Sequence, residues 1–310
     1  MTLQVIVTGG TGLIGRALVD ELLAAGHQVT VLSRNPERHQ SDMPAAVTLL
    51  EWDARTAKGW AEAAEGADAI VNLAGESLAG EGWLLPQRWT EERRHLIRHS
   101  RLNAGQAIVD AVAQAQSKPG IVVQSSAVGY YGPREDELVT ESEPPAADFL
   151  ASVCQDWEAS TLPVEQMGVR RAIIRTGLVL SAGGGSLEFV RLPAGLLVAG
   201  PFGLGQQYWS WIHLKDVAKG IRFLIEHDSA AGAFNLTAPN PVTNWTFTLE
   251  MSRSMRRPFV PVPPFAVKLL VGDVSTVVLD GQRAVPQHLQ ELGFDWAYPQ
   301  LETALYDLHR

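Results

Sequence analysis

The segment TGGTGLIG at residues 8–15 places Gly9, Gly12 and Gly15 between an apolar run typical of a strand and a helical pattern. In such a turn the first glycine allows a sharp change of direction, the second lets a phosphate approach the backbone, and the third lets helix and strand pack closely. The N–H groups at the start of the helix attract anions. The segment therefore predicts a site for the pyrophosphate of a dinucleotide. The residues expected there are Gly9, Thr11, Gly12, Leu13 and Ile14, with Gly15 at the packing position.

Short apolar runs alternate with longer helical patterns over the first 180 residues. We expect a helix over about 91–114 and strands at QVIVTG, QVTVLSR, VTLLEWD, DAIVNLAG, GIVVQSSA and RRAIIRTGLVL. Such Val, Ile and Leu runs are typical of strands buried on both faces, and alternation with helices indicates parallel crossover connections. The chain is therefore predicted to have an α/β fold, a Rossmann-type doubly wound parallel sheet.

The end of the second predicted strand indicates which dinucleotide suits the site. NAD binders usually carry Asp or Glu there for the ribose 2′-hydroxyl, whereas an Arg accommodates a 2′-phosphate. This chain has Ser33 and Arg34 at that point, Arg38 one turn later, and no acid before Glu37. A guanidinium and a hydroxyl suit a phosphate dianion, so we expect NADP(H) rather than NAD(H). The alternative is that Arg34 is an ordinary solvated surface arginine.

Other cofactor contacts are expected from residues that follow the remaining strands and from the helix over 91–114. Asp53 is positioned to meet the adenine amino group, and the backbone of residues 73–75 to pass beneath the adenosine ribose and phosphates. Arg101 could hold a phosphate or a substrate carboxylate, or form a surface salt bridge. The full set is Asp53, Leu73, Ala74, Gly75, Glu76, Arg101, Ser125, Thr176 and Gly177.

The alternation of short apolar runs and helical patterns ends after Leu180. We expect an NADP-binding Rossmann domain of residues 1–180 and about 206–237, and a substrate-side loop and C-terminal cap formed by 181–205 and 238–310. Phe202, Trp209 and Trp211, together with the glycines at 183–185, predict an apolar pocket closed by a mobile loop.

Composition narrows the class of protein. The 310 residues are 46% hydrophobic and 19% charged, which is typical of a soluble globular chain. A net charge of −9 argues against a nucleic-acid partner, because phosphate binding requires clustered Lys and Arg. The single cysteine excludes an internal disulfide, no signal peptide is visible, and the apolar stretch at 187–204 is interrupted by charges and prolines. We expect a cytoplasmic protein that acts on a small molecule and has no membrane partner.

The landmarks on this chain resemble those of the extended short-chain dehydrogenase/reductases, and most closely an atypical branch of epimerase-family proteins with a small C-terminal domain of unknown function. The resemblance covers essentially the whole chain and implies the same fold and NADP(H) binding. The segments that carry it are Ser33–Arg34, Asn72–Glu76, Ser100–Leu102, Tyr130–Gly132, Trp211–Asp216 and Pro286–Leu305.

The resemblance also shows what this chain lacks. In the extended reductases a Tyr phenol transfers the proton, a Lys ammonium lowers its pKa, and a Ser or Thr orients the substrate. The corresponding positions hold Leu150, Cys154 and Ala127. None of the five tyrosines is followed four residues later by Lys, and no Lys lies between Lys118 and Lys215. The usual proton relay is therefore absent.

Three residues are candidates for the missing catalytic role: Tyr130, Tyr131 and Ser126, which lie at or just past the end of the fifth predicted strand. Paired aromatics at such a place are more often packing residues. Cys154 lacks a neighbouring base, and His213 is more simply a structural histidine. His95 and His99 have metal-ligand spacing but no third ligand, so no metal site is expected.

Two functions remain open at this point. The first is an NADP(H)-dependent oxidoreductase of the epimerase/dehydratase-like group, acting on an unknown small molecule without the Tyr–Lys pair. The alternative is a non-catalytic NADP(H)-binding sensor or scaffold.

Overall fold

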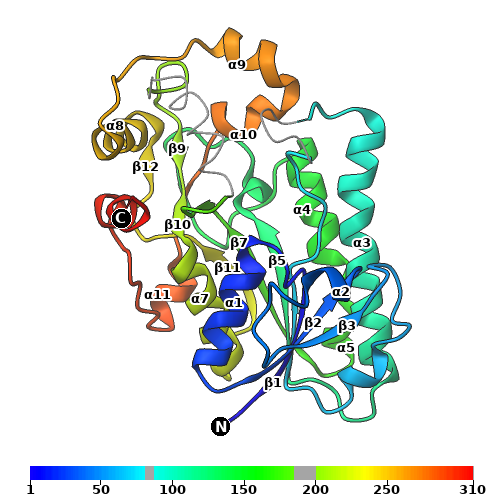
Figure 1. The fold of residues 1–310 in the computed structure, drawn as a ribbon. Helices are drawn as coiled ribbons and strands as arrows, with labels where there is room; N and C mark the ends of the chain where they lie inside the picture. The colour runs from blue at the N-terminus through cyan, green and yellow to red at the C-terminus, as the bar shows by residue number, and fades with distance from the viewer. Residues whose placement is uncertain (81–86, 185–199, 310) are drawn as a thin grey trace.

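The protein is built around a seven-stranded parallel sheet with helices on both faces, as seen in a computed structural model that describes residues 1–80, 87–184 and 200–309 (Figure 1). The strand order is β11-β7-β5-β4-β1-β2-β3, and all six neighbouring pairs are parallel. The prediction of a Rossmann-type doubly wound sheet is confirmed. The strands are β1 (Gln4–Thr8), β2 (Gln28–Ser33), β3 (Thr48–Glu51), β4 (Ala69–Asn72), β5 (Ile121–Ala127), β7 (Arg170–Thr176) and β11 (Gly232–Leu236).

Alternate residues of the central strands enter two different cores. In β1, Val5 and Val7 pack with helices α1 (Leu13–Ala24) and α7 (Leu214–Glu226), whereas Ile6 packs on the opposite face. That opposite face is covered by α3 (Glu91–Gln114), whose bounds match the predicted helix, and by α5 (Pro163–Gln166). Because both faces are buried, the strands consist of nearly continuous apolar runs.

The direction in which the strands are added reverses next to β1. The chain proceeds from β1 to β2 and β3 on one side, and through β4, β5, β7 and β11 on the other. Ligands of doubly wound sheets bind outside the carboxyl ends of the strands at this switch point. The glycine turn at residues 8–15 lies at that point, directly after β1.

The sixth predicted strand, RRAIIRTGLVL, is two strands. β7 ends at Thr176, and β8 (Leu178–Leu180) leaves the main sheet to pair with β10 (Trp211–His213). Gly177 lies at the break, where a Cβ would collide with the carbonyl oxygen of Ser210. The apolar run concealed this break because both halves are strands.

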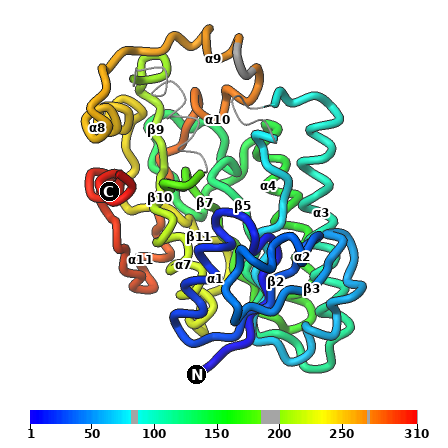
Figure 2. The backbone as a smooth tube through the Cα atoms, viewed as in Figure 1, coloured from blue at the N-terminus to red at the C-terminus, as the bar shows by residue number. Residues whose placement is uncertain are grey.

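The C-terminal part, with α8 at the upper left of the backbone trace (Figure 2), adds a third core beside the sheet. Trp209 and Trp211 pack there on Phe247 and Leu301. The remaining described strands are β6 (Leu138–Val139), β9 (Tyr208–Trp209), β12 (Val242–Thr243) and β13 (Arg283–Ala284). The remaining described helices are α2 (Pro36–His39), η1 (Ala61–Ala64), η2 (Val128–Tyr131), α4 (Phe149–Ala159), α8 (Asn244–Met255), α9 (Pro264–Val271), η3 (Gly272–Ser275), α10 (Thr276–Leu279), α11 (Gln287–Glu291) and α12 (Leu301–Leu308).

None of the helices in the described ranges combines the length and apolarity that crossing a bilayer requires.

Candidate active site

The glycine turn has the geometry that its three glycines predict. Gly9 has a φ of +67°, and a Cβ there would lie 2.8 Å from the carbonyl oxygen of Leu73. A Cβ on Gly15 would collide with the carbonyl oxygen of Gly9, so only glycine allows α1 to pack this closely. A Cβ on Gly12 would meet only that carbonyl, at 3.3 Å, which leaves its outer side open. Helix α1 begins after Gly12 with no side-chain cap and no acid in its first turn, so the N–H groups of Leu13 and Ile14 remain suited to an anion.

The end of β2 presents the two residues expected to select the cofactor. Ser33 is buried, and its hydroxyl accepts a hydrogen bond of 3.2 Å from the N–H of Asn35. The guanidinium of Arg34 is exposed and forms no hydrogen bond or ion pair with the described residues. Nothing in that part of the chain therefore competes with a ligand anion for Arg34.

Asp53 has a local structural role at the turn after β3. Its carboxylate accepts hydrogen bonds of 2.8 Å from the N–H groups of Arg55 and Thr56 and from the Thr56 hydroxyl. Desolvation by burial opposes ionisation, but these hydrogen bonds outweigh it and lower the pKa of Asp53. A contact with an adenine amino group would use lone pairs that these bonds leave available.

The segment after β4 is held in place from two sides. The N–H of Leu73 donates to the carbonyl of Thr8 at 3.2 Å, and the N–H of Ala74 donates to the Thr8 hydroxyl at 3.2 Å. On the other side, the N–H of Glu76 donates to the Ser100 hydroxyl at 3.0 Å, and Arg101 lies directly against Gly75. The segment thus joins the glycine turn to α3.

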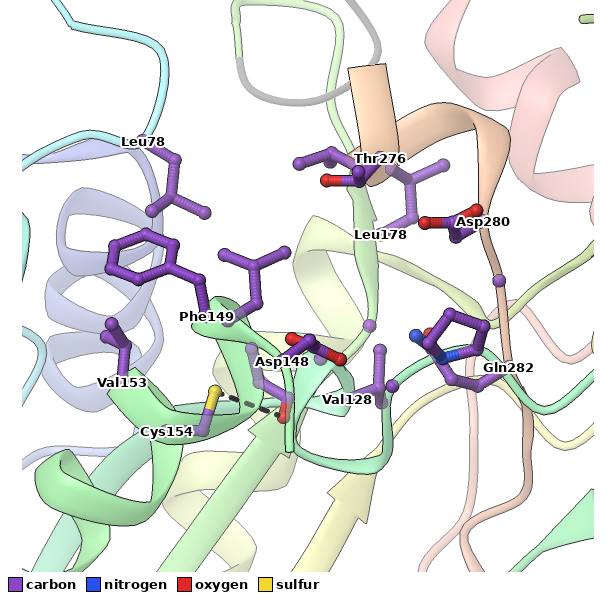
Figure 3. A pocket seen from close by; sticks show the side chains of 18 of the residues that line it. Leu78, Val128, Asp148, Phe149, Val153, Cys154, Leu178, Thr276, Asp280 and Gln282 are labelled. Atoms are coloured by element: carbon purple, nitrogen blue, oxygen red, sulfur yellow. Dashed lines mark hydrogen bonds between the residues drawn. The ribbon is translucent and has the colours of Figure 1, made fainter. Parts of the chain in front are cut away.

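A cavity of about 380 Å³ opens at the carboxyl ends of β5 and β7 (Figure 3). Most of its wall is apolar. The wall is formed by Leu78, Trp89, Ala127, Val128, Gly129, Gly132, Pro133, Phe149, Leu150, Val153, Cys154, Trp157, Thr176, Gly177, Leu178, Trp209 and Val277, among others. Its charged side chains are Arg94, Arg101, Asp148, Asp273 and Asp280, and Tyr208 and Gln282 add polar groups. We call this cavity the sheet-end pocket.

The three positions that lack the usual proton relay face this pocket together. Ala127, Leu150 and Cys154 all line it. The Cys154 thiol lies 3.8 Å from the carbonyl oxygen of Ala127, along the dashed line of Figure 3. Burial raises the pKa of Cys154 to about 11, so the sulfur remains a thiol and is a poor nucleophile. The register inferred from the sequence is therefore consistent with the placement of all three side chains.

Tyr131 and Ser126 lie behind the pocket wall, in a buried polar network. The Tyr131 hydroxyl donates to Asn235 Oδ1 at 2.7 Å and accepts from Arg175 Nη1 at 3.0 Å. The Ser126 hydroxyl donates to Glu158 Oε1 at 2.7 Å. Neither side chain lines the pocket. Burial raises the pKa of Tyr131 to about 12, despite the nearby Arg175, which further reduces its suitability as a proton donor at neutral pH.

The centre of this network is the ion pair of Arg175 and Glu158. Arg175 Nε and Nη2 donate to the two carboxylate oxygens at 2.9 and 3.0 Å, and both side chains are almost fully buried. Tyr130 packs on the same guanidinium, which lies 3.6 Å from its ring centroid. Tyr130 is half-buried, does not line the pocket, and forms no hydrogen bond through its hydroxyl with the described residues. The positions of Tyr130, Tyr131 and Ser126 thus favour a structural role for all three.

Arg101 is the most deeply buried cation of the pocket wall, with 8% of its surface exposed. Its Nη1 donates to the carbonyls of Glu76 and Ile97 at 3.1 and 2.9 Å, and its guanidinium stacks 4.6 Å from the Trp157 ring. Burial lowers the pKa of Arg101 to about 10. Among the described residues no carboxylate pairs with Arg101, and its Nε and Nη2 have no hydrogen-bond partner there.

Three acids of the pocket were missed by the sequence analysis: Asp148, Asp280 and Asp273, which pairs with Arg94. Asp148 is the N-cap of α4, where its Oδ1 accepts from the N–H of Ala151 at 2.9 Å. Asp280 follows α10 and lies on the far side of the pocket from Cys154 (Figure 3). Burial raises the pKa of Asp280; Lys268 opposes this shift and the Asp148 charge adds to it. The only sequence signal was the capping position of Asp148 before a helix.

Other predicted residues divide between the pocket and the core. Thr176, Gly177 and Trp209 line the pocket, whereas Ser125, Phe202 and Trp211 are buried outside its wall. The glycine cluster at 183–185 extends beyond the described residues, so the loop expected there is outside them. His213 caps α7 and stacks on Tyr298, and burial lowers its pKa to about 4. Within the described ranges, no group of His, Cys, Asp and Glu side chains could hold a metal ion.

The sequence profile of the NAD dependent epimerase/dehydratase family matches residues 5–237. The chain belongs to this family. A profile described as a domain of unknown function, DUF1731, matches residues 262–308. These matches confirm the resemblance stated from the sequence.

Relatives and solved structures agree with this assignment. An epimerase family protein of Staphylococcus aureus is 35% identical over 98% of both chains, and the chloroplastic SDR39U1 homolog of Arabidopsis thaliana is 36% identical over 98% of this chain and 86% of that one. The crystal structure of human epimerase family protein SDR39U1 with NADPH matches with a TM-score of 0.87, 31% identity and 99% coverage of both chains. The UDP-glucose 4-epimerase of Thermus thermophilus, at 20% identity and a TM-score of 0.78, shows the fold alone.

Proposed function

We propose that this protein is an NADP(H)-dependent oxidoreductase that acts on a small molecule in the sheet-end pocket. The observation that carries the proposal is the position of the pocket. It lies at the carboxyl edge of the sheet, and Ala127, Leu150 and Cys154 face it where related reductases carry their proton relay.

The residues of the cofactor site fit NADP(H). The glycine turn and the first turn of α1 would hold the pyrophosphate. A Cβ on Gly9 or Gly15 would collide with the neighbouring backbone, and the first turn of α1 contains no acidic residue that would repel the phosphates. Ser33 and Arg34 would hold the 2′-phosphate, since the guanidinium is exposed and has no partner among the described residues. Thr176 and Gly177 extend the site to the pocket. The human SDR39U1 structure, which was solved with NADPH, supports the same choice.

When bound, NADPH supplies a hydride. The chain's own contribution is to exclude water and to supply a proton. The apolar side chains of α4, together with Val128 and Leu178, exclude water from the pocket. Of the acids that line it, Asp280 has a raised pKa and so retains its proton to a higher pH than an exposed aspartate. We infer that Asp280 donates the proton that Tyr supplies in related reductases.

The proposal is tested by following NADPH consumption at 340 nm against a panel of carbonyl compounds and activated alkenes. We expect turnover with at least one compound, loss of most of it in Asp280→Asn, and retention of it in Tyr130→Phe. Full activity in Asp280→Asn would remove the assigned proton donor.

The alternative is a non-catalytic NADP(H) sensor or scaffold, and one observation favours it. Leu150 and Cys154 occupy the positions of the relay with side chains that cannot transfer a proton at neutral pH. Tight NADPH binding without consumption across the panel would select this alternative.

A further inference from the structure

Arg101 is a buried cation with no carboxylate hydrogen-bonded to it within residues 1–80, 87–184 and 200–309. Removing a guanidinium from water is unfavourable unless an anion compensates for the lost hydration. Only 8% of Arg101 is exposed, yet in the described part of the chain its guanidinium donates only to two backbone carbonyls and stacks on the face of Trp157. The nearby carboxylate of Glu76 is taken by Arg93, whose Nη1 lies 3.1 Å from it. The free nitrogens Nε and Nη2 can form the paired hydrogen bonds that a carboxylate accepts.

The surroundings of Arg101 indicate what else the ligand must carry. From α4, the apolar side chains of Leu150, Val153 and Trp157 line the same cavity, and Leu78 and Phe149 continue the wall. Sugar hydroxyls would find few hydrogen-bond partners against these side chains. A ligand with an apolar body and a single negative charge fits better, because the charge lies at Arg101 and the body covers the apolar wall.

The anion could belong to the cofactor or to the substrate. The residues of the glycine turn and those at the end of β2 do not line the sheet-end pocket, whereas Arg101 does. In the proposed function the cofactor phosphates would be held by the first turn of α1 and the guanidinium of Arg34. The position of Arg101 therefore favours the substrate.

We propose that Arg101 binds the carboxylate of an amphipathic monocarboxylate substrate whose apolar body lies along α4. This inference rests on the proposed function, because it names the substrate class of the same pocket. This class differs from the nucleotide sugar in the name of UDP-glucose 4-epimerase, which shares the fold, and the apolar wall is the reason.

The test measures binding of 3-phenylpropanoate and its neutral amide, 3-phenylpropanamide, to the protein saturated with NADP⁺, by ligand-observed NMR or calorimetry. We expect the carboxylate to bind about tenfold more tightly than the amide, because only the carboxylate forms charge-assisted hydrogen bonds. In Arg101→Gln the preference should disappear, while the Kd for NADPH stays within about twofold. Arg101→Lys should retain a weaker preference, because it keeps the charge without the two paired donors, and it serves if the Gln variant does not fold.

Arg98→Gln is the matched control, because Arg98 is on the same helix but pairs with Asp156 outside the pocket. It should bind both probes as the wild type does. Equal binding of carboxylate and amide to the wild type, or an unchanged preference in Arg101→Gln or Arg101→Lys, would overturn the proposal. Binding of the carboxylate to the nucleotide-free protein but not to the NADP⁺-saturated one, with weaker NADPH binding in Arg101→Gln, would instead assign Arg101 to the cofactor. If the wild type does not bind NADPH but still binds the carboxylate more tightly than the amide, the proposed function is refuted and the anion site at Arg101 is retained.

Discussion

Replacing Tyr131 with Phe separates a structural role from a catalytic one. The hydroxyl that is removed is fully buried and makes two hydrogen bonds, of 2.7 Å to Asn235 Oδ1 and 3.0 Å from Arg175 Nη1. Arg175 Nη1 keeps the carbonyl of Glu141 at 3.2 Å, but Asn235 Oδ1 loses its donor. An unsatisfied buried acceptor and a lost charge-assisted bond together cost about 2–3 kcal/mol of the free energy of unfolding. For a chain of this size that corresponds to a melting temperature lower by roughly 3–5 °C.

The assay compares Tyr131→Phe with Tyr130→Phe by thermal and urea denaturation, and measures NADPH consumption per folded molecule. Tyr130 is the matched control because its ring packs on the same guanidinium, whereas its hydroxyl has no hydrogen-bond partner in the described ranges. We expect Tyr130→Phe to change stability by less than about 0.5 kcal/mol. Neither variant should lose activity once the folded fraction is taken into account.

Two results would refute this reasoning. If the two variants were equally stable, the buried network would not carry the energy assigned to the Tyr131 hydroxyl. If Tyr131→Phe kept its stability but lost turnover, the phenol would act in the chemistry and the pocket wall would have to open to it.

Three further predictions concern the ion pair, the glycine turn and the pocket acid. Glu158→Gln leaves a buried guanidinium without its charge partner and should lower the free energy of unfolding by about 3–5 kcal/mol in urea titrations; a loss below about 1 kcal/mol would contradict this. Gly15→Ala places a methyl group against the carbonyl of Gly9 and should weaken NADPH binding, measured by calorimetry, about tenfold or more. Gly183→Ala is the control, because a Cβ there meets nothing within 4 Å, and it should bind NADPH as the wild type does. The pKa of Asp280 is raised in the folded protein, so ionisation of Asp280 destabilises the fold as the pH rises from its unfolded pKa through its folded pKa. Asp280→Asn should therefore melt at a higher temperature than the wild type at pH 7, and this difference should disappear below about pH 4. A difference in melting temperature that does not change with pH would contradict this prediction.

The parts of the fold that depend on local signals could be predicted from the sequence. The bounds of α3 follow from its N-cap, Thr90, whose side chain accepts from the N–H of Arg93, and from its long helical pattern. Part of the glycine turn is also local, because Gly12 and Gly15 closely approach only residues of the turn itself. These features need no knowledge of distant contacts.

The features that depend on distant contacts could not be predicted. Gly177 ends β7 because the backbone of Ser210 lies against it, and no pattern in the apolar run reveals that contact. Tyr130 and Tyr131 are adjacent and chemically identical, so only the position of Arg175 on β7 determines which hydroxyl is buried. Asp280 reaches the pocket because the C-terminal part of the chain packs across it, which its neighbours in sequence do not indicate.

The central claim is that Arg34 and the glycine turn hold NADP(H). Calorimetry of NADPH and NADH with the wild type and with Arg34→Asp tests it most directly. We expect the wild type to bind NADPH more tightly than NADH. Arg34→Asp should weaken NADPH binding by about tenfold or more and change NADH binding only slightly, because the lost contact is with the 2′-phosphate. Equal weakening of both nucleotides, or no binding of either to the wild type, would contradict the account.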